Sequence, residues 1–191
     1  MGTNSLDRAR SVRRWVVTSA AFALSSALAG PSFAATQGSF GATSTGTVSI
    51  SASVPARARI TGLVDVAFTN QDPASAASQP QSICVWSNTA TKGYSITATG
   101  DGTANAFTLA GASTTVPYTV QWNASSGQTS GTSLTAGTAL GGLVSTATAQ
   151  TCASGPTSSA SLIVGMTAAT LQTMQASTSY TGVLTLLVTP Q

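Results

Sequence analysis

Few residues in this sequence have side chains that could do chemistry. The chain contains four acidic residues, all Asp, and it has no Glu and no His. Without His, neither a Ser-His-Asp nor a Cys-His arrangement can form. Asp65, Asp72 and Asp101 are spread along the chain, which disfavours a carboxylate pair for acid–base hydrolysis. We therefore expect no catalytic residue, no bound cofactor and no enzyme activity.

The two cysteines, Cys84 and Cys152, are the remaining candidates for chemistry. A zinc site would need two further Cys or His ligands, and the sequence has none, so we expect no metal site. An even number of Cys in an exported chain instead favours a disulfide. Closing a loop of this length would contribute on the order of 4 kcal/mol to stability.

Export is indicated by residues 1–34, which have the layout of a secretory signal peptide. A start with four Arg residues is followed by an apolar or small run over residues 15–29, and Ser32-Phe33-Ala34 offers a cleavage site. The apolar run is too short for a membrane-spanning helix. We expect the mature chain to begin near Ala35, to cross the inner membrane to the periplasm, and to have no membrane insertion afterwards.

The net charge of +3 belongs to this leading segment. Once it is removed, the basic and acidic side chains are equal in number: Arg57, Arg59 and Lys92 against Asp65, Asp72 and Asp101. No basic face remains that could bind nucleic acid. We therefore expect no nucleic-acid partner.

Residues 45–55 form a short stretch in which apolar and polar side chains alternate strictly. Val48, Ile50, Ala52 and Val54 alternate with Thr and Ser, and Pro55 ends the pattern. This period of two is typical of a strand with one buried face. The stretch could be the first strand of its own domain, or an arm offered to another molecule.

The rest of the chain predicts a single all-β domain. Short alternating runs separated by turn signals indicate an antiparallel β-sandwich with almost no helix. We expect residues 180–189, apolar on nearly both faces, to form a central strand. The predicted organisation is a signal peptide over residues 1–34, an N-terminal arm over 35–55 and a sandwich over 56–191. Strands are expected at residues 58–69, 82–87, 94–98, 107–109, 116–122, 140–144 and 158–166, a long loop at 123–138, and a helical turn at 167–174.

Several segments of this chain resemble subunits of bacterial chaperone–usher pili. Residues 47–55 resemble the donor strand of the alternative, colonisation-factor-like pilins, and residues 179–189 resemble the last strand of that class. Ile83-Cys84, followed by residues 94–97, is similar to the archaic pilins related to spore coat protein U. The cysteine pair departs from the colonisation-factor subunits, so the resemblance leaves the subclass open.

The resemblance implies an immunoglobulin-like sandwich that lacks its last strand and offers an acceptor groove. A periplasmic chaperone would fill that groove first, an outer-membrane usher would receive the subunit, and the next subunit's N-terminal strand would replace the chaperone by β-augmentation. The donor residues would be Val48, Ile50, Ala52 and Val54. The groove would be lined from the C-terminal strand by Val183, Leu184, Leu186, Leu187 and Val188.

The function implied is a fimbrial subunit that polymerises on the bacterial surface and contributes to adhesion. Two alternatives remain. The first is a pilus tip adhesin, which would normally need an additional receptor domain. The second is a self-contained secreted β-sandwich, in which residues 45–55 form the domain's own edge strand.

Overall fold

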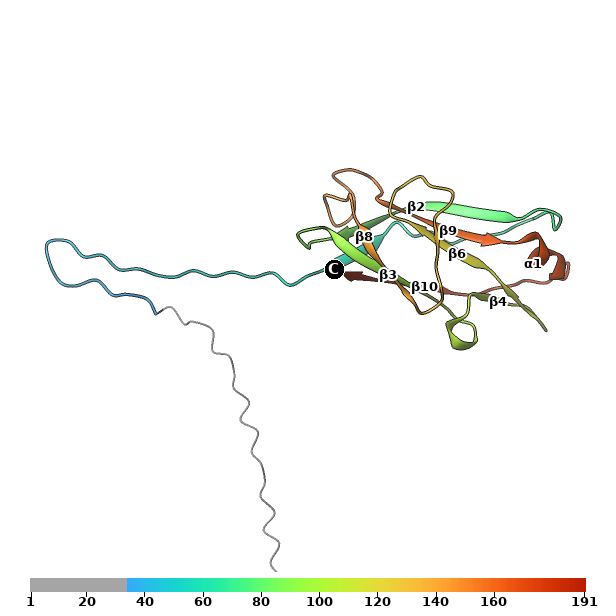
Figure 1. The fold of residues 1–191 in the computed structure, drawn as a ribbon, viewed down its shortest axis with the longest axis horizontal. Helices are drawn as coiled ribbons and strands as arrows, with labels where there is room; N and C mark the ends of the chain where they lie inside the picture. Colours follow the sequence, from blue (N-terminus) through green and yellow to red (C-terminus); the bar gives the residue numbers. More distant parts are fainter. Residues whose placement is uncertain (1–33) are drawn as a thin grey trace, which may run out of the picture. The chain divides into compact units, whose positions relative to one another are not determined.

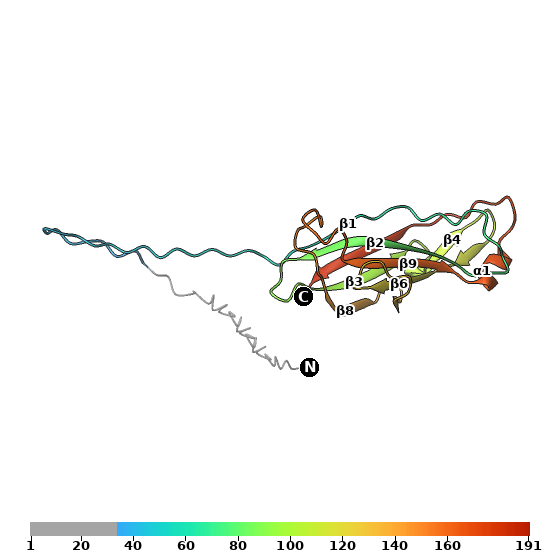
Figure 2. The same cartoon turned by 90° about the horizontal axis from the view of Figure 1, so that it is seen from above.

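The computed structural model describes residues 34–191, so the predicted signal peptide lies outside the described residues except for Ala34. The chain divides into two units, Met1–Ala52 and Ser53–Gln191. Figures 1 and 2 show the second unit as a set of strands stacked in layers. No helix in residues 34–191 is long and apolar enough to span a membrane.

The second unit is an all-β sandwich, as the sequence predicts, and all its strand pairs are antiparallel. One sheet has the order β1-β2-β9-β6-β7, with β1 Ala58–Thr61, β2 Ala77–Ser87, β9 Ala160–Met166, β6 Thr119–Asn123 and β7 Thr132–Ser133. The other has the order β10-β3-β8, with β10 Leu184–Pro190, β3 Gly93–Gly100 and β8 Ala139–Val144. A third, small sheet pairs β4 Thr108–Ala110 with β5 Thr115–Pro117, and a 3₁₀ turn η1 spans Thr103–Asn105.

The core lies between the two larger sheets and is built from alternate residues of their strands. Tyr94 and Ile96 of β3 and Trp122 of β6 are fully buried. The Trp122 and Tyr94 rings meet edge to face, with centroids 6.3 Å apart. The alternating pattern that predicts strands therefore also identifies the buried face.

The strand order places β10 at an edge. The orders β1-β2-β9-β6 and β10-β3 correspond to A-B-E-D and F-C of an immunoglobulin-type sandwich, where a further strand G pairs with F. Within residues 34–191, no strand takes the position of G beside β10. The expectation of a central strand at residues 180–189 is therefore wrong. Exposed Val183 and Leu187 make the segment apolar on both faces without its outer face being covered.

Two predicted strands have different bounds in the structure. The strand expected over residues 58–69 ends at Thr61, since Gly62 adopts a positive φ of 81° that takes the chain out of the ladder. The strand expected over 116–122 is divided at Tyr118, because the chain passes there from β5, which pairs with β4, to β6, which pairs with β9. The inward alternation continues across the break, because Val116, Tyr118 and Val120 are all buried.

Strand β2 starts earlier than the sequence predicts, and it includes Pro80. The main-chain bond from Asn88 N–H to Arg57 C=O (3.1 Å) fixes the alternation along β2, so that even-numbered residues turn their main chain toward β1. Strand β1 stops opposite Cys84, and Pro80 lies beyond it. The missing N–H of Pro80 therefore costs no ladder bond.

The two ends of the sandwich differ. Helix α1, Ala168–Thr173, follows β9 at one end, in the region where the sequence predicts a helical turn, and Thr167 caps it by accepting the Thr170 N–H at 3.1 Å. At the other end lie the start of β1 and the C-terminus (Figure 1). There Gln191 N–H donates to Gly93 C=O at 3.0 Å.

The first unit is described only from residue 34 to Ala52. Thr36 and Thr47 exchange two main-chain hydrogen bonds of 2.9 Å, which close a loop with exposed Phe40 inside it. Residues 45–55 are in no strand, since this isolated bridge is the only main-chain pairing of residues 34–52, so the alternative in which they form the domain's own edge strand is not observed.

Candidate functional site: the open edges of β1 and β10

Strand β10 presents apolar side chains to the core from an unpaired edge. Leu184, Leu186 and Val188 are half-buried and pack against the core cluster. Val183 and Leu187, which alternate with them, are 61% and 60% exposed. The structure thus divides the five residues expected to line a groove into three that face inward and two that face outward.

The main chain of the inward-facing residues points to the unpaired side of β10. Gln191 and Gly93 continue the β10–β3 register and are joined by a main-chain hydrogen bond, so the odd-numbered residues of β10 bond to β3. In an antiparallel ladder the alternate residues turn their N–H and C=O the other way. Leu184, Leu186 and Val188 therefore offer three N–H and three C=O groups to a further strand.

Strand β1 is the corresponding edge of the five-stranded sheet. The pair Arg57–Asn88 continues the β1–β2 register and is hydrogen-bonded, so Ala58 and Ile60 turn their main chain away from β2. Ile60 is half-buried and packs against the core. Strands β1 and β10 lie close to one another. We refer to the unpaired sides of β1 and β10 together as the open edges.

Side-chain amides extend β1 at both ends, where main-chain partners are missing. Beyond the end of β1, Val64 N–H donates to Gln81 Oε1 at 2.9 Å, and Gln81 Nε2 donates to Val64 C=O at 3.2 Å. Before its start, Arg57 N–H donates to Asn88 Oδ1 at 2.6 Å. Neither amide stands out in the sequence, because Asn and Gln side chains are mostly exposed and solvated.

The four predicted donor residues lie outside any strand and are exposed. Val48, Ile50 and Val54 are 76%, 92% and 78% exposed, and Ala52 is also exposed. Contiguous large apolar side chains with this exposure are unusual on a folded surface. Residues 48–54 thus have the alternation that predicts a buried face, but no described part of the chain buries that face.

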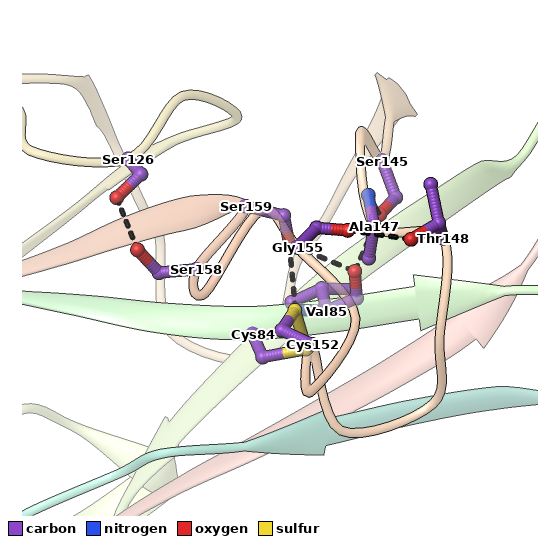
Figure 3. The surroundings of a disulfide bond; sticks show 10 residues. All are labelled: Cys84, Val85, Ser126, Ser145, Ala147, Thr148, Cys152, Gly155, Ser158 and Ser159. Carbon is purple, nitrogen blue, oxygen red and sulfur yellow. Dashed lines mark hydrogen bonds between the residues drawn. A yellow bond between two sulfur atoms is a disulfide. The ribbon is translucent and has the colours of Figure 1, made fainter.

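The predicted disulfide is confirmed. Cys84 and Cys152 are bonded, with their Cα atoms 5.9 Å apart, and they form a small cluster with Ala147 beside Trp86. Next to it the Ser159 hydroxyl accepts the Val85 N–H and donates to the Val85 C=O, both at 2.8 Å (Figure 3). Ser145 also donates to this carbonyl. The cluster joins β2 to the segment between β8 and β9 and has no reactive thiol.

Several titratable side chains of the described residues have hydrogen-bond partners. Asp101 accepts the Val183 N–H at 3.0 Å and so ties the turn after β3 to the start of β10. Burial raises the pKa of Tyr94, partly offset by the hydrogen bond from Trp122. A hydrogen bond with Thr114, followed by one from the Gln175 main chain, lowers the pKa of Tyr180. Residues 34–191 contain no cluster of three or more His, Cys, Asp or Glu side chains that could hold a metal ion.

A shallow cavity of about 250 Å³ lies over β2, β6 and β9, apart from the open edges. Its lining includes Thr119, Gln121 and Ile163, and none of its lining residues is ionisable. A ligand in this cavity would therefore contact no acidic or basic side chain.

No protein-family model matches this sequence. No curated protein matches it either. Among solved structures, the chain is similar to one from a study described as "Chaperone-tip adhesin complex is vital for synergistic activation of CFA/I fimbriae biogenesis", with 17% sequence identity and a TM-score of 0.45. The similarity covers 71% of this chain and 41% of that chain, so this chain spans less than half the length of its structural neighbour.

Proposed function

We propose that this protein is a structural fimbrial subunit that polymerises on the bacterial surface and contributes to adhesion. In this proposal, residues 45–55 of one copy add a strand to the open edges of the next. The observation that carries the proposal is the match between the exposed apolar face of residues 48–54 and the unpaired, inward-facing edges of β1 and β10. The role is structural, and it requires no catalytic group.

The arm and the open edges correspond in length and in pattern. Strand β10 has seven residues, and the alternation of the arm covers residues 48–54. In β10 the inward residues are Leu and Val, whereas Thr185, Leu187 and Thr189 are exposed on the outer face. The arm also alternates, with Val48, Ile50 and Val54 on one face and Ser on the other. An added strand can therefore continue the inward apolar face of β10.

Apolar burial and main-chain hydrogen bonding both favour the contact. Each Val or Ile side chain contributes roughly 1.5–3 kcal/mol when it is fully buried, and Ala52 contributes less. The main-chain groups of Leu184, Leu186 and Val188 add hydrogen bonds of about 1 kcal/mol each. Part of this sum is offset by the cost of ordering the arm.

The contact is head to tail, because the arm and the open edges are different surfaces of one chain. Such a heterologous contact does not close on itself and propagates as a fibre. A subunit of this kind would be exported to the periplasm and held there by a chaperone that covers the open edges. An outer-membrane usher would then deliver it to the cell surface.

The test compares two double variants of the mature chain that add the same charge to opposite faces of the arm. Ile50→Asp with Val54→Asp places two carboxylates on the apolar face, whereas Ser49→Asp with Ser53→Asp places them on the polar face. We expect the first variant to stay monomeric and the second to form multimers like the wild type, as measured by size-exclusion chromatography with light scattering. Far-UV circular dichroism should show the same fold in both.

Two results would contradict the proposal. Multimers that persist in the Ile50→Asp, Val54→Asp variant would show that the apolar face of the arm is not the contact. A wild-type chain that stays monomeric and stable at every concentration would instead support a self-contained secreted sandwich.

A further inference from the structure

The chain just before β1 is held by one residue, Asn88, through its main chain and its side-chain amide. Asn88 N–H donates to Arg57 C=O at 3.1 Å, and Arg57 N–H donates to Asn88 Oδ1 at 2.6 Å. Asn88 Nδ2 then donates to Pro55 C=O at 2.9 Å. Three hydrogen bonds from a single residue thus fix the main chain of residues 55–57.

These hydrogen bonds take the place of main-chain bonds from β2, which ends before it reaches this position. Strand β2 ends at Ser87, and the chain turns back over residues 89–92, where Lys92 N–H donates to Thr89 C=O at 2.9 Å. No main-chain group of β2 therefore remains opposite Pro55. The Asn88 amide reaches this position and keeps Pro55 and Arg57 in the β1–β2 register.

This register matters because the arm could also pair with its own chain. To lie beside its own β1, the segment that ends at Val54 would have to reverse its direction before Ala58. Only Pro55, Ala56 and Arg57 are available for that reversal, and a hairpin loop of three residues needs a turn followed by a left-handed residue. Arg57 cannot serve in such a loop while it forms a hydrogen-bonded antiparallel pair with Asn88.

We propose that Asn88 is a positioning residue that prevents the arm from closing onto its own open edges and so keeps it available to a second copy. The inference rests on the proposed function, since it concerns the same arm and the same edges. It predicts that loss of the Asn88 amide converts an intermolecular contact into an intramolecular one.

The experiment uses the mature chain and three variants. Asn88→Ala removes both side-chain bonds, whereas Asn88→Asp retains an acceptor for the Arg57 N–H and loses the donor to Pro55. Thr89→Ala is the matched control, because Thr89 lies in the same turn and its hydroxyl bonds only to Ser87 and Gly93. Each chain is refolded and separated by size, and hydrogen exchange of the amides of residues 48–54 is measured in the monomer and multimer fractions.

We expect the wild type and Thr89→Ala to protect these amides only in multimers. In Asn88→Ala, the monomer fraction should increase, and its arm amides should exchange on the order of tenfold more slowly than in the wild-type monomer, as expected when two bonds that favour the open form are lost. Asn88→Asp should lie between the two. A variant that is merely destabilised would lose multimers without protecting the arm of its monomer.

The outcomes separate this inference from the proposed function. If wild-type multimers protect the arm, but Asn88→Ala monomers exchange as fast as wild-type monomers, the positioning role of Asn88 is wrong and the proposed function stands. If the arm amides are unprotected in wild-type multimers, both proposals fail.

Discussion

The indole Nε1 of Trp122 donates a hydrogen bond of 3.2 Å to the hydroxyl of Tyr94, and this bond joins the two sheets inside the core. Trp122 lies in β6 and Tyr94 in β3, and both side chains are almost completely buried. The core also contains Tyr118, whose hydroxyl is the one buried side-chain polar atom in the described part of the chain without a hydrogen-bond partner. Two buried tyrosines of the same size thus differ in the use of their hydroxyl groups.

Replacing these tyrosines by phenylalanine should therefore have opposite effects. Tyr94→Phe leaves the buried Trp122 N–H without an acceptor and should lower the free energy of unfolding by about 1–3 kcal/mol. Tyr118→Phe removes a hydroxyl that has no partner, so it should leave stability unchanged or raise it slightly. Urea denaturation followed by tryptophan fluorescence measures both. Equal losses in the two variants would contradict the assignment.

The tyrosines should also ionise in a set order as the pH rises. Hydrogen bonds with Thr114 and Gln175 lower the pKa of Tyr180, whereas burial raises the pKa of Tyr94 and, together with the charge of Asp101, that of Tyr118. We expect the first step in a tyrosinate absorbance titration to disappear in Tyr180→Phe.

The free energy of unfolding should also depend on pH through the buried tyrosines. For Tyr94 and Tyr118 the folded-state pKa lies above the unfolded value of 10.0, so their contribution is complete below pH 10.0 and is lost as the pH rises further. Denaturation midpoints measured on both sides of pH 10.0 should therefore fall only above it. In the absorbance titration, a Tyr180→Phe chain that titrates like the wild type would contradict the order in which the tyrosines ionise.

Ser159 and Ser158 are neighbours with different structural roles. Ser159 is 1% exposed and satisfies both main-chain groups of Val85, while Ser158 is half-buried and bonds to the Ser126 hydroxyl (Figure 3). Ser159→Ala leaves the buried Val85 N–H without an acceptor and should cost about 1–3 kcal/mol in unfolding free energy. Ser158→Ala, the control, should change it by less than about 0.5 kcal/mol. Thermal and urea unfolding with the disulfide intact would distinguish them.

The sequence predicts the sandwich and much of its core, because alternation reports which side chains are buried wherever a strand has one buried face. Val116, Tyr118, Val120 and Trp122 keep this alternation although β5 and β6, on either side of Tyr118, belong to different sheets. The division depends on which strands lie next to each other, and a local pattern does not contain that information. The small strand β7 falls in a stretch of Gly, Ser and Thr that reads as loop for the same reason.

The candidate site was only partly predictable for a related reason. An alternating apolar segment indicates that a face will be buried, but not by which chain, and Ile50 has the same pattern whether its partner is its own domain or a second copy. Leu184, Leu186 and Val188 were identifiable as an apolar strand, whereas the edge position of β10 follows from the pairing of distant strands. The roles of Asn88 and Gln81 depend on where β2 and β1 end, and their side chains give no signal in the sequence.

The open edges can be tested separately from the arm with a synthetic peptide of residues 45–55. The recipient is the Ile50→Asp, Val54→Asp chain, whose own arm should not bind. A ligand at a hundred times its Kd stabilises the folded state by about 2.7 kcal/mol, so the peptide should raise the melting temperature of this chain. Leu186→Thr in the recipient should greatly reduce this peptide-induced shift, because Leu186 faces the core from the open edge.

Leu187→Thr is the matched control for this measurement. It makes the same change one residue further along β10, where the side chain is 60% exposed on the outer face. The peptide-induced shift should stay close to that of the unmodified recipient, since a one-residue step along a strand moves a side chain to the opposite face. Similar losses in Leu186→Thr and Leu187→Thr would mean that the peptide does not bind along the inward face of β10. A peptide with Ile50 and Val54 replaced by Asp should give no shift with any recipient.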